Sequence, residues 1–126
     1  MITLEEVLAL HDLSIKFFGG RIGIRNMDLL KSAVTRPFQT FDNKDVYFSV
    51  FEKAAALLES LVKNHPFVDG NKRTGFLASI IFFKRNNIKL KASEAESYEF
   101  IMKVASSEIL FNDMVTWFQN NSKFIL

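Results

Sequence analysis

The sequence contains no cysteine, and this absence excludes disulfide bonds and thiolate zinc sites. Its two histidines, His11 and His65, lie far apart and lack the i, i+4 spacing of a helical metal pair. No apolar run reaches the ~18 residues of a membrane-spanning helix. The first residues include acids and no basic leader, which does not fit a signal peptide. A cytoplasmic protein without a membrane span or a structural metal is therefore expected.

The net charge and the length of the chain bear on its partners and on the number of its domains. The net charge of +2 is too small to indicate a nucleic-acid partner by itself. The 126 residues suit one domain with a continuous core and are too few for two, so we expect a single domain over residues 1–126. Phenylalanine occurs fourteen times. Most of these rings should fill the core, although exposed rings can also line a groove for a partner.

Helical periodicity and capping signals account for most of the chain. Two capping boxes, which begin at Thr3 and Ser93, each predict a helix start. Glycine pairs and prolines mark helix ends, because glycine suits a C-cap and the residue before proline avoids the helical region. The expected helices cover about residues 4–18, 27–34, 46–62, 74–84, 94–104 and 107–120. The fold class is therefore all-α, a compact bundle of about six helices.

Residues 38–45, with the sequence FQTFDNKD, break this helical pattern. Aromatic rings alternate there with polar groups, and an Asp-Asn-Lys-Asp cluster favours a turn. We expect a small hairpin or flap. A plain surface loop anchored by Phe38 and Phe41 is an equally good interpretation from these residues alone.

Two groups of polar residues have structural interpretations. His11 lies on or beside the apolar stripe of the first helix with no acid or nucleophile beside it, so a packed or hydrogen-bonded histidine is favoured over a catalytic one. A basic cluster surrounds the turn at residues 86–87. Because cations are stabilised near a helix C-terminus, a solvated helix end is favoured over a nucleic-acid patch. The cluster consists of Lys84, Arg85, Lys89 and Lys91.

The stretch from 65 to 74, HPFVDGNKRT, is the most chemically loaded part of the chain, and it lies between two apolar helices. It is not a P-loop, because the spacing GxxxxGK[ST] is not met, and it is not a calcium loop, because only one acid precedes the glycine. An ordinary interhelical turn is the structural interpretation. In that case Phe67 enters the core and residues 69–71 cap the next helix.

The residue types in this stretch also suit phosphate transfer. Backbone amides of residues 70–73 would be unpaired at a helix start, and with two adjacent cations they would form an anion site. Arg73 can bind phosphate oxygens in a bidentate way, and Asp69 can hold a Mg²⁺ ion that bridges phosphates. His65 is near enough in sequence to accept a proton from an attacking hydroxyl.

The stretch resembles the signature of the Fic/Doc family, which runs His, any residue or Pro, Phe, any, Asp or Glu, Gly or Ala, Asn, Gly or Lys, Arg. Every fixed position of that signature is met. The segment GIRNMDLLKSAVTRPFQTF, residues 23–41, is similar to the one that precedes the motif in the Doc, or death-on-curing, branch. The resemblance therefore covers essentially the whole chain.

The resemblance implies a helical fold, an ATP substrate with Mg²⁺, and roles for the residues of the motif. His65 would be the catalytic base and Asp69 the Mg²⁺ ligand, while Phe67 would be structural. The phosphate and nucleotide would be bound by Gly70, Asn71, Lys72 and Arg73, with Arg73 as the clamp. A flap beside the site would align the target segment, and it would consist of Phe41, Asp42, Asn43 and Lys44.

Lys72 stands at the position that separates two reactions within the family. Adenylyl-transferring Fic enzymes usually have glycine there, whereas Doc-like members have lysine. The resemblance therefore implies a protein kinase that transfers the γ-phosphate of ATP to a Ser or Thr hydroxyl. Transfer of adenylate is the alternative, because Pro66 and Gly70 match the Fic pattern. A non-catalytic module that binds nucleotide or a partner is the further alternative.

The resemblance also implies partners. No Ser or Thr in the chain has Glu four residues later, so the inhibitory helix of self-inhibited Fic proteins, with a pattern like [ST]xxxE[GN], is not expected. A Doc-like toxin would instead be inhibited by a Phd-like antitoxin, whose disordered segment folds into a groove. Its implied target is a translation component, elongation factor Tu, and direct binding of nucleic acid is not expected.

Overall fold

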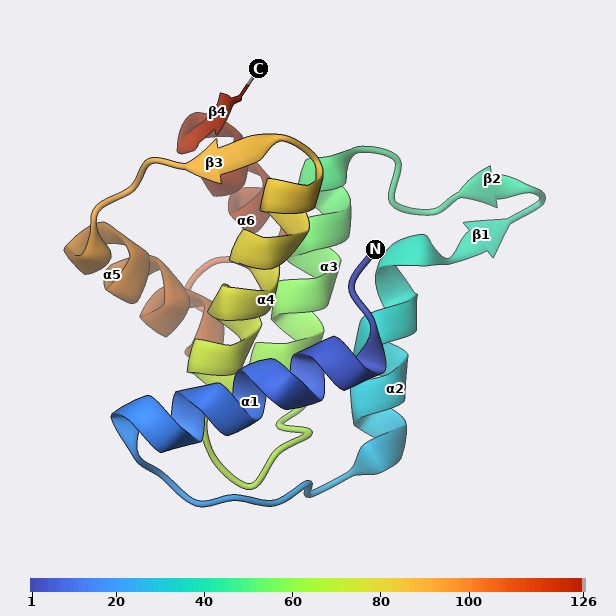
Figure 1. Ribbon diagram of the computed structural model, residues 1–126. Coiled ribbons are helices and arrows are strands. Elements are labelled where there is room, and N and C mark those ends of the chain that lie inside the picture. Colours follow the sequence, from blue (N-terminus) through green and yellow to red (C-terminus); the bar gives the residue numbers. More distant parts are fainter. Residues whose placement is uncertain (126) are drawn as a thin grey trace.

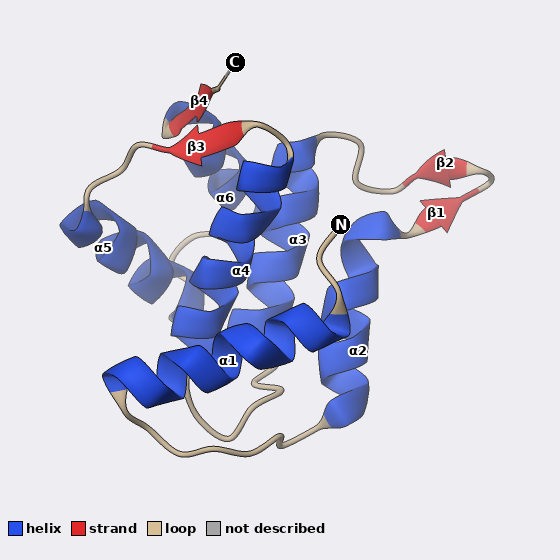
Figure 2. Ribbon diagram, in the orientation of Figure 1, coloured by secondary structure: helices blue, strands red, loops and turns tan. Residues whose placement is uncertain are grey.

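The computed structural model describes residues 1–125 and consists mainly of helices (Figures 1 and 2). The helices are α1 (Leu4–Phe18), α2 (Met27–Thr35), the short 3-10 helix η1 (Arg36–Phe38), α3 (Val50–Lys63), α4 (Asn71–Arg85), α5 (Glu94–Ala105) and α6 (Phe111–Asn120). The strands are β1 (Thr40–Phe41), β2 (Lys44–Asp45), β3 (Ile88–Leu90) and β4 (Ser122–Phe124). This confirms the predicted bundle of about six helices with one small hairpin.

Helices α3 and α4 form the centre of the fold, and Figure 1 shows α1 crossing their lower ends. Close packing between the two central helices depends on small residues. A Cβ atom added at Gly75 in α4 would lie 3.1 Å from Cγ2 of Val62 and 3.3 Å from Cδ1 of Leu58, so a larger residue would separate the helices. The stretch 54–58 of α3 is buried throughout. The loop between α3 and α4 therefore joins two closely packed helices of the core.

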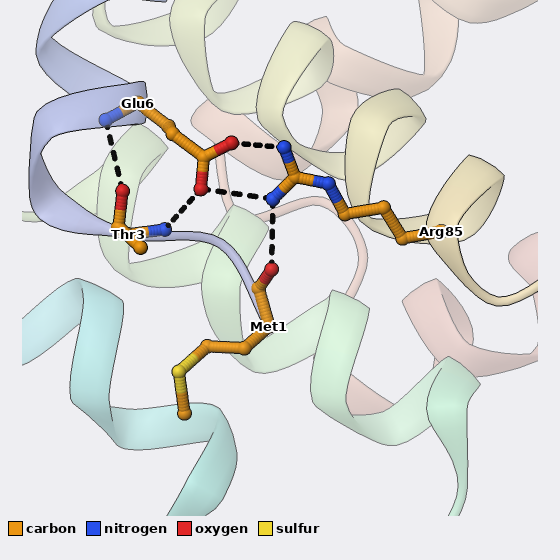
Figure 3. Close-up of polar contacts among 4 residues, drawn as sticks. All are labelled: Met1, Thr3, Glu6 and Arg85. Atoms are coloured by element: carbon orange, nitrogen blue, oxygen red, sulfur yellow. Dashed lines mark hydrogen bonds and ion pairs between the residues drawn. The ribbon is translucent and has the colours of Figure 1, made fainter.

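The start of α1 is joined to the end of α4 (Figure 3). Thr3 and Glu6 form the predicted capping box, and the Arg85 guanidinium donates to both carboxylate oxygens of Glu6 and to the carbonyl oxygen of Met1. The bond from Arg85, followed by that from the Thr3 amide, lowers the pKa of Glu6 to about 2. Arg85 is thus paired rather than simply solvated, while its neighbour Lys84 is exposed.

Three helix starts differ from the expectation. Helix α3 begins at Val50, because the Ser49 hydroxyl accepts from the amide of Glu52 and caps it there. Helix α4 begins at Asn71, three residues early, because Gly70 adopts a left-handed conformation as its N-cap. Helix α6 begins at Phe111, since residues 106–109 form a turn and a bend and Leu110 is the N-cap.

The last strand joins the end of the described chain to the segment after α4. Strand β4 pairs antiparallel with β3, and Leu90 lies opposite Ser122. The ring of Phe124 is 66% exposed, so the contact is made by backbone hydrogen bonds. Within residues 1–125, no helix has both the length and the apolar character to cross a membrane.

The predicted hairpin is present at residues 40–45. Phe41 pairs with Lys44, and the two turn residues Asp42 and Asn43 both have positive φ angles, of 53° and 62°. Such angles are typical of a tight two-residue hairpin turn, and Asp and Asn tolerate them better than most residues. Phe41 is 80% exposed, so it does not anchor a loop in the core.

Candidate active site

The loop between α3 and α4 is hydrogen-bonded to the segment of residues 20–26. The sequence did not predict this contact. Ile24 forms an isolated antiparallel bridge with Phe67, and the Val68 amide donates to the Gly23 carbonyl at 3.0 Å. The amides of Arg25 and Asn26 both donate to the carbonyl of Pro66. This segment therefore lies along the motif as a neighbouring extended strand would.

His65 stands at the start of the loop in an uncommon backbone conformation. Its φ angle is 48°, in the left-handed region that a non-glycine residue rarely adopts. The guanidinium of Arg25 donates to the carbonyls of both Asn64 and His65, and this pair of bonds holds the turn at the end of α3. The His65 residue is exposed and lines the cavity described below.

Phe67 is the structural anchor that the sequence predicted. It is 1% exposed, and its ring stacks on that of His11 with centroids 3.8 Å apart. Asn71 locks the backbone around it: Oδ1 accepts from the Phe67 amide at 2.9 Å, and Nδ2 donates to the Phe67 carbonyl at 3.0 Å. The Asn71 side chain is thus turned inward, so only its backbone amide remains for an anion. Its Nδ2 lies 3.5 Å from Nδ1 of His65, too far for a strong hydrogen bond.

Asp69 carries a carboxylate that is held ionised. Oδ2 accepts from the amide of Arg21 at 3.0 Å and Oδ1 from that of Gly70 at 2.9 Å. These two bonds, the first being the larger cause, lower the pKa of Asp69, and the nearby Arg73 adds to the effect. A Cβ atom at Gly20 would lie only 2.8 Å from Oδ2, so glycine is required for the segment to pass this close.

The carboxylate of Asp69 fits a Mg²⁺ ion that is shared with a phosphate. It is exposed and uses one acceptor position on each oxygen, which leaves further lone pairs for a ligand bond. Among residues 1–125 no cluster of three or more acidic, histidine or cysteine residues could hold a metal alone. Mg²⁺ characteristically combines one or two carboxylates with substrate phosphates and water, so a single carboxylate is sufficient.

The N-terminus of α4 lies beside this carboxylate and has the features that suit an anion. The first intrahelical bond runs from the Thr74 amide to the Gly70 carbonyl, so the amides of residues 71–73 precede the hydrogen-bonded turns. The helix dipole makes this end favourable for negative charge. Lys72 and Arg73 are both exposed there and add two positive charges. The predicted phosphate-binding residues are therefore brought together.

Arg73 is positioned by α1, through two residues that the sequence did not single out. Its Nη1 donates to the hydroxyl of Ser14 at 3.2 Å, and its guanidinium lies 4.7 Å from the centre of the Phe18 ring. Ser14 is buried and follows His11 by one helical turn. The signal in the sequence was a pair of polar residues, His11 and Ser14, on an otherwise apolar helix face.

A cavity of about 630 Å³ opens next to these groups, between α4 and α5. One end is polar and belongs to the motif, and the rest is mainly apolar. The polar end includes His65, Asp69, Gly70, Asn71, Lys72 and Arg73, and the remainder is lined mainly by Phe18, Phe76, Leu77, Ile80, Tyr98, Ile101 and Met102. Helix α4 is not fully buried on this face, where Phe76, Leu77 and Ile80 are only partly buried.

The hairpin is not part of this site. Phe41, Asp42, Asn43 and Lys44 do not line the cavity, and Figure 1 places the hairpin and the motif loop at opposite ends of α3. A helix of fourteen residues spans about 21 Å, which accounts for the separation. The structure therefore places these four residues, which the resemblance assigns to a target-aligning flap, away from the motif loop. Residues 20–26 are the segment that borders the motif instead.

The sequence is similar to those of a known protein family and of two characterised proteins. Residues 1–83, which include the whole motif and α1, match the model of the Fic/DOC family. The chain belongs to the Fic/DOC family. Over 112 residues it is 38% identical to Toxin Doc of Mycolicibacterium smegmatis (strain ATCC 700084 / mc(2)155), a match that covers 89% of this chain and 78% of that protein. It is also 29% identical over 89 residues to Protein kinase doc of Escherichia phage P1, covering 71% of this chain and 70% of the other.

The resemblance read from the motif is thus confirmed. This Fic/DOC protein is similar to Doc-type toxins over most of its length, and family membership fits an enzyme that transfers a group from a nucleotide. The polar residues of the motif line one cavity, and α1, which lies far from the motif in sequence, supplies two of the side chains that hold it, His11 and Ser14.

Proposed function

We propose that the protein is a Doc-type toxin that transfers the γ-phosphate of ATP to a Ser or Thr hydroxyl of a translation factor, and that this factor is elongation factor Tu. The observation that carries the proposal is the convergence of an exposed histidine, an ionised carboxylate and a cationic helix N-terminus at one end of a cavity. The name of the phage P1 relative, a protein kinase, supports the reaction type.

In this reaction His65 accepts the proton of the target hydroxyl, and the hydroxyl oxygen forms a bond to the γ-phosphorus. The bond from that phosphorus to the oxygen bridging the β- and γ-phosphates breaks, and ADP leaves. Arg73 and the amides of residues 71–73 stabilise the charge on the transferred group. A positioned base of this kind contributes a rate increase of about 10²- to 10⁴-fold.

A divalent cation would be held by Asp69 and by phosphate oxygens of ATP. When bound, Mg²⁺ would neutralise negative charge on the phosphates. The chain's own contribution is to keep this carboxylate ionised and fixed, through the amides of Arg21 and Gly70. The group is therefore ready to bind a cation at neutral pH.

Lys72 favours γ-phosphate transfer over adenylate transfer. It is exposed at the second residue of α4 and lines the cavity, so its ammonium group can reach a phosphate placed at the helix N-terminus. A glycine at this position would let the diphosphate of a nucleotide lie directly against the backbone, as the Fic pattern implies. A lysine side chain would crowd that space and favour a different orientation of the nucleotide.

The protein is proposed to be neutralised by a Phd-like antitoxin that binds as an amphipathic helix. The name Toxin Doc of the relative from Mycolicibacterium smegmatis supports an antitoxin partner. The apolar part of the cavity, with Phe76, Leu77 and Ile80 on α4 and Met102 on α5, suits such a helix. A bound helix there would lie next to the phosphate site and would exclude the nucleotide or the target.

The reaction is tested by incubating the protein with elongation factor Tu, Mg²⁺ and ATP labelled at either the γ- or the α-phosphate. We expect label only from γ-labelled ATP, with a mass increase of one phosphate on the target, and loss of transfer in His65→Ala. Lys63→Ala is the matched control, since Lys63 ends α3 two residues before His65 and does not line the cavity.

Transfer of label only from α-labelled ATP would show that the protein is an adenylyltransferase rather than a kinase. Binding of ATP without any transfer to a protein would instead support a non-catalytic module. Transfer that persists unchanged in His65→Ala would refute the role of His65 as the base.

A further inference from the structure

His11 is a buried titratable residue that the proposed reaction does not use. It lies in α1, 3% exposed, and is separated from Asp69 by 58 positions in the chain. Its Nε2 atom lies 2.8 Å from the carbonyl oxygen of Asp69. Because a carbonyl oxygen only accepts hydrogen bonds, Nε2 must carry the proton and donate it. The tautomer of His11 is thereby set by the motif backbone.

The same imidazole ring makes two further contacts with the loop. It stacks on Phe67 with an angle of 4° between the planes. Its Cδ2 and Nε2 atoms would lie 3.6 Å from a Cβ atom at Gly70, so the ring also closes the space beneath this glycine. One side chain of α1 therefore contacts the loop on both sides of Asp69 and at the carbonyl of Asp69 itself.

With these contacts, both the side chain and the backbone carbonyl of Asp69 are hydrogen-bonded. Its carboxylate is held by the amides of Arg21 and Gly70, and its carbonyl by His11. The peptide group that joins Asp69 to Gly70 contains this carbonyl and also the Gly70 amide. Its orientation therefore sets both the position of the metal ligand and the left-handed turn at which α4 begins.

We infer that His11 is a positioning residue, which holds the 69–70 peptide so that Asp69 and the N-terminus of α4 face the same phosphate group. The inference rests on the proposed function, because it assigns the role toward Mg²⁺ and ATP. His11 acts through one hydrogen bond and a flat ring contact, and it takes no part in proton transfer. Its two contacts can be separated by substitution.

His11→Phe keeps a flat ring against Phe67 and removes the N–H donor, whereas His11→Gln keeps an N–H donor of similar reach and removes the ring. A lost hydrogen bond of about 0.5–1.5 kcal/mol corresponds to a change of about 2- to 13-fold in an equilibrium constant. We therefore expect His11→Phe to bind Mg²⁺–ATP about 2- to 13-fold more weakly, with a smaller loss of melting temperature than in His11→Gln because the stacked ring is kept. We expect His11→Gln to bind almost as the wild type does, with a lowered melting temperature.

Binding is measured by titration calorimetry on the full chain, with ATP at several Mg²⁺ concentrations, beside thermal unfolding of each variant. Asp12→Asn is the control, because Asp12 is the exposed neighbour of His11 and should leave both quantities unchanged. Should His11→Phe not fold, His11→Gln still decides: weak binding with the donor present refutes the inference. Wild-type affinity of a folded His11→Phe refutes it as well.

The test separates this inference from the proposed function. If the wild-type protein binds no Mg²⁺–ATP, the proposed function fails. If the wild type binds it and the affinities of the two His11 variants follow only their melting temperatures, His11 is merely structural. Crossed behaviour, in which one variant loses affinity and the other loses stability, supports positioning.

Discussion

Replacement of Gly20 by alanine tests whether close passage of the 20–26 segment is needed to hold Asp69. Gly20 has a φ angle of 116°, and its added Cβ atom would lie 2.8 Å from Oδ2 of Asp69. Ordinary van der Waals contact begins at 3.4 Å, so the carboxylate must move by about 0.6 Å or the segment must retreat. Either movement weakens the bond that Oδ2 accepts from the Arg21 amide.

Gly19→Ala provides a matched control for backbone strain. Gly19 has a φ angle of 84° and a ψ angle of 178°, in a region that essentially only glycine adopts, but no atom lies within 4 Å of its added Cβ. Both substitutions should therefore cost about 1–3 kcal/mol of strain. In a domain of this size each kcal/mol corresponds to a loss of about 3–5 °C in melting temperature. The two variants should thus lose similar stability.

The Mg²⁺ dependence of ATP binding and the rate of phosphate transfer should distinguish the two variants. A misplacement of about 1 Å can lower a reaction rate by ~10²-fold, so a shift of about 0.6 Å of the carboxylate should cost on the order of tenfold. We expect Gly20→Ala to require more Mg²⁺ for half-maximal ATP binding and to transfer phosphate about tenfold more slowly. Gly19→Ala should keep the wild-type Mg²⁺ dependence once measured well below its melting temperature.

The assay is ATP binding and label transfer as a function of Mg²⁺ concentration, with thermal unfolding measured in parallel. Equal functional loss in both variants would show that strain alone is responsible. A Gly20→Ala protein with unchanged Mg²⁺ dependence would refute the assignment of Asp69 as the cation ligand held by this segment.

Two further predictions concern stability. Asn71→Ala leaves the buried amide and carbonyl of Phe67 without their partners and should lower the free energy of unfolding by about 2–4 kcal/mol, as measured by urea denaturation; a loss below 1 kcal/mol would contradict the structural role. Glu6→Gln removes a carboxylate whose pKa falls from 4.5 to about 2 on folding, so it should lose the stability that the wild type holds above pH ~4.5, and this difference should shrink as the pH falls toward about 2. Melting temperatures across this pH range test it, with parallel curves as the contrary result, and Arg85→Gln should reproduce the effect.

Much of the fold could be predicted because its signals are local. The capping boxes at Thr3 and Ser93 satisfy amides within three residues of themselves, so both helix starts were predicted correctly. The starts of α3 and α6 were misplaced, because apolar periodicity continued into residues that a turn removes from the helix. The β3–β4 pair was not foreseen, since Leu90 and Ser122 lie 32 positions apart and carry no local signal of pairing.

The reactive residues of the site also lie close together in the sequence, but the residues that hold them in place do not. The motif residues from His65 to Arg73 were identified as a group, because their types and spacing carry a phosphate-binding pattern within one loop and one helix N-terminus. The hairpin lies away from the motif loop, and the sequence did not indicate this separation. A hairpin signal at residues 40–45 specifies a turn, but it cannot specify which end of α3 that turn will occupy.

The sequence by itself determined the helices, the hairpin turn and the set of reactive groups, since each depends on residues a few positions apart. Only the tertiary structure decided how those groups are held: Arg25 on the carbonyl of His65, Gly20 against Asp69, His11 on the 69–70 peptide, and Ser14 on Arg73. The physical reason is that these contacts join α1 and the segment after it to a loop about fifty residues away. They exist only once α1 has packed across α4, and burial of the shared core is what brings the two together.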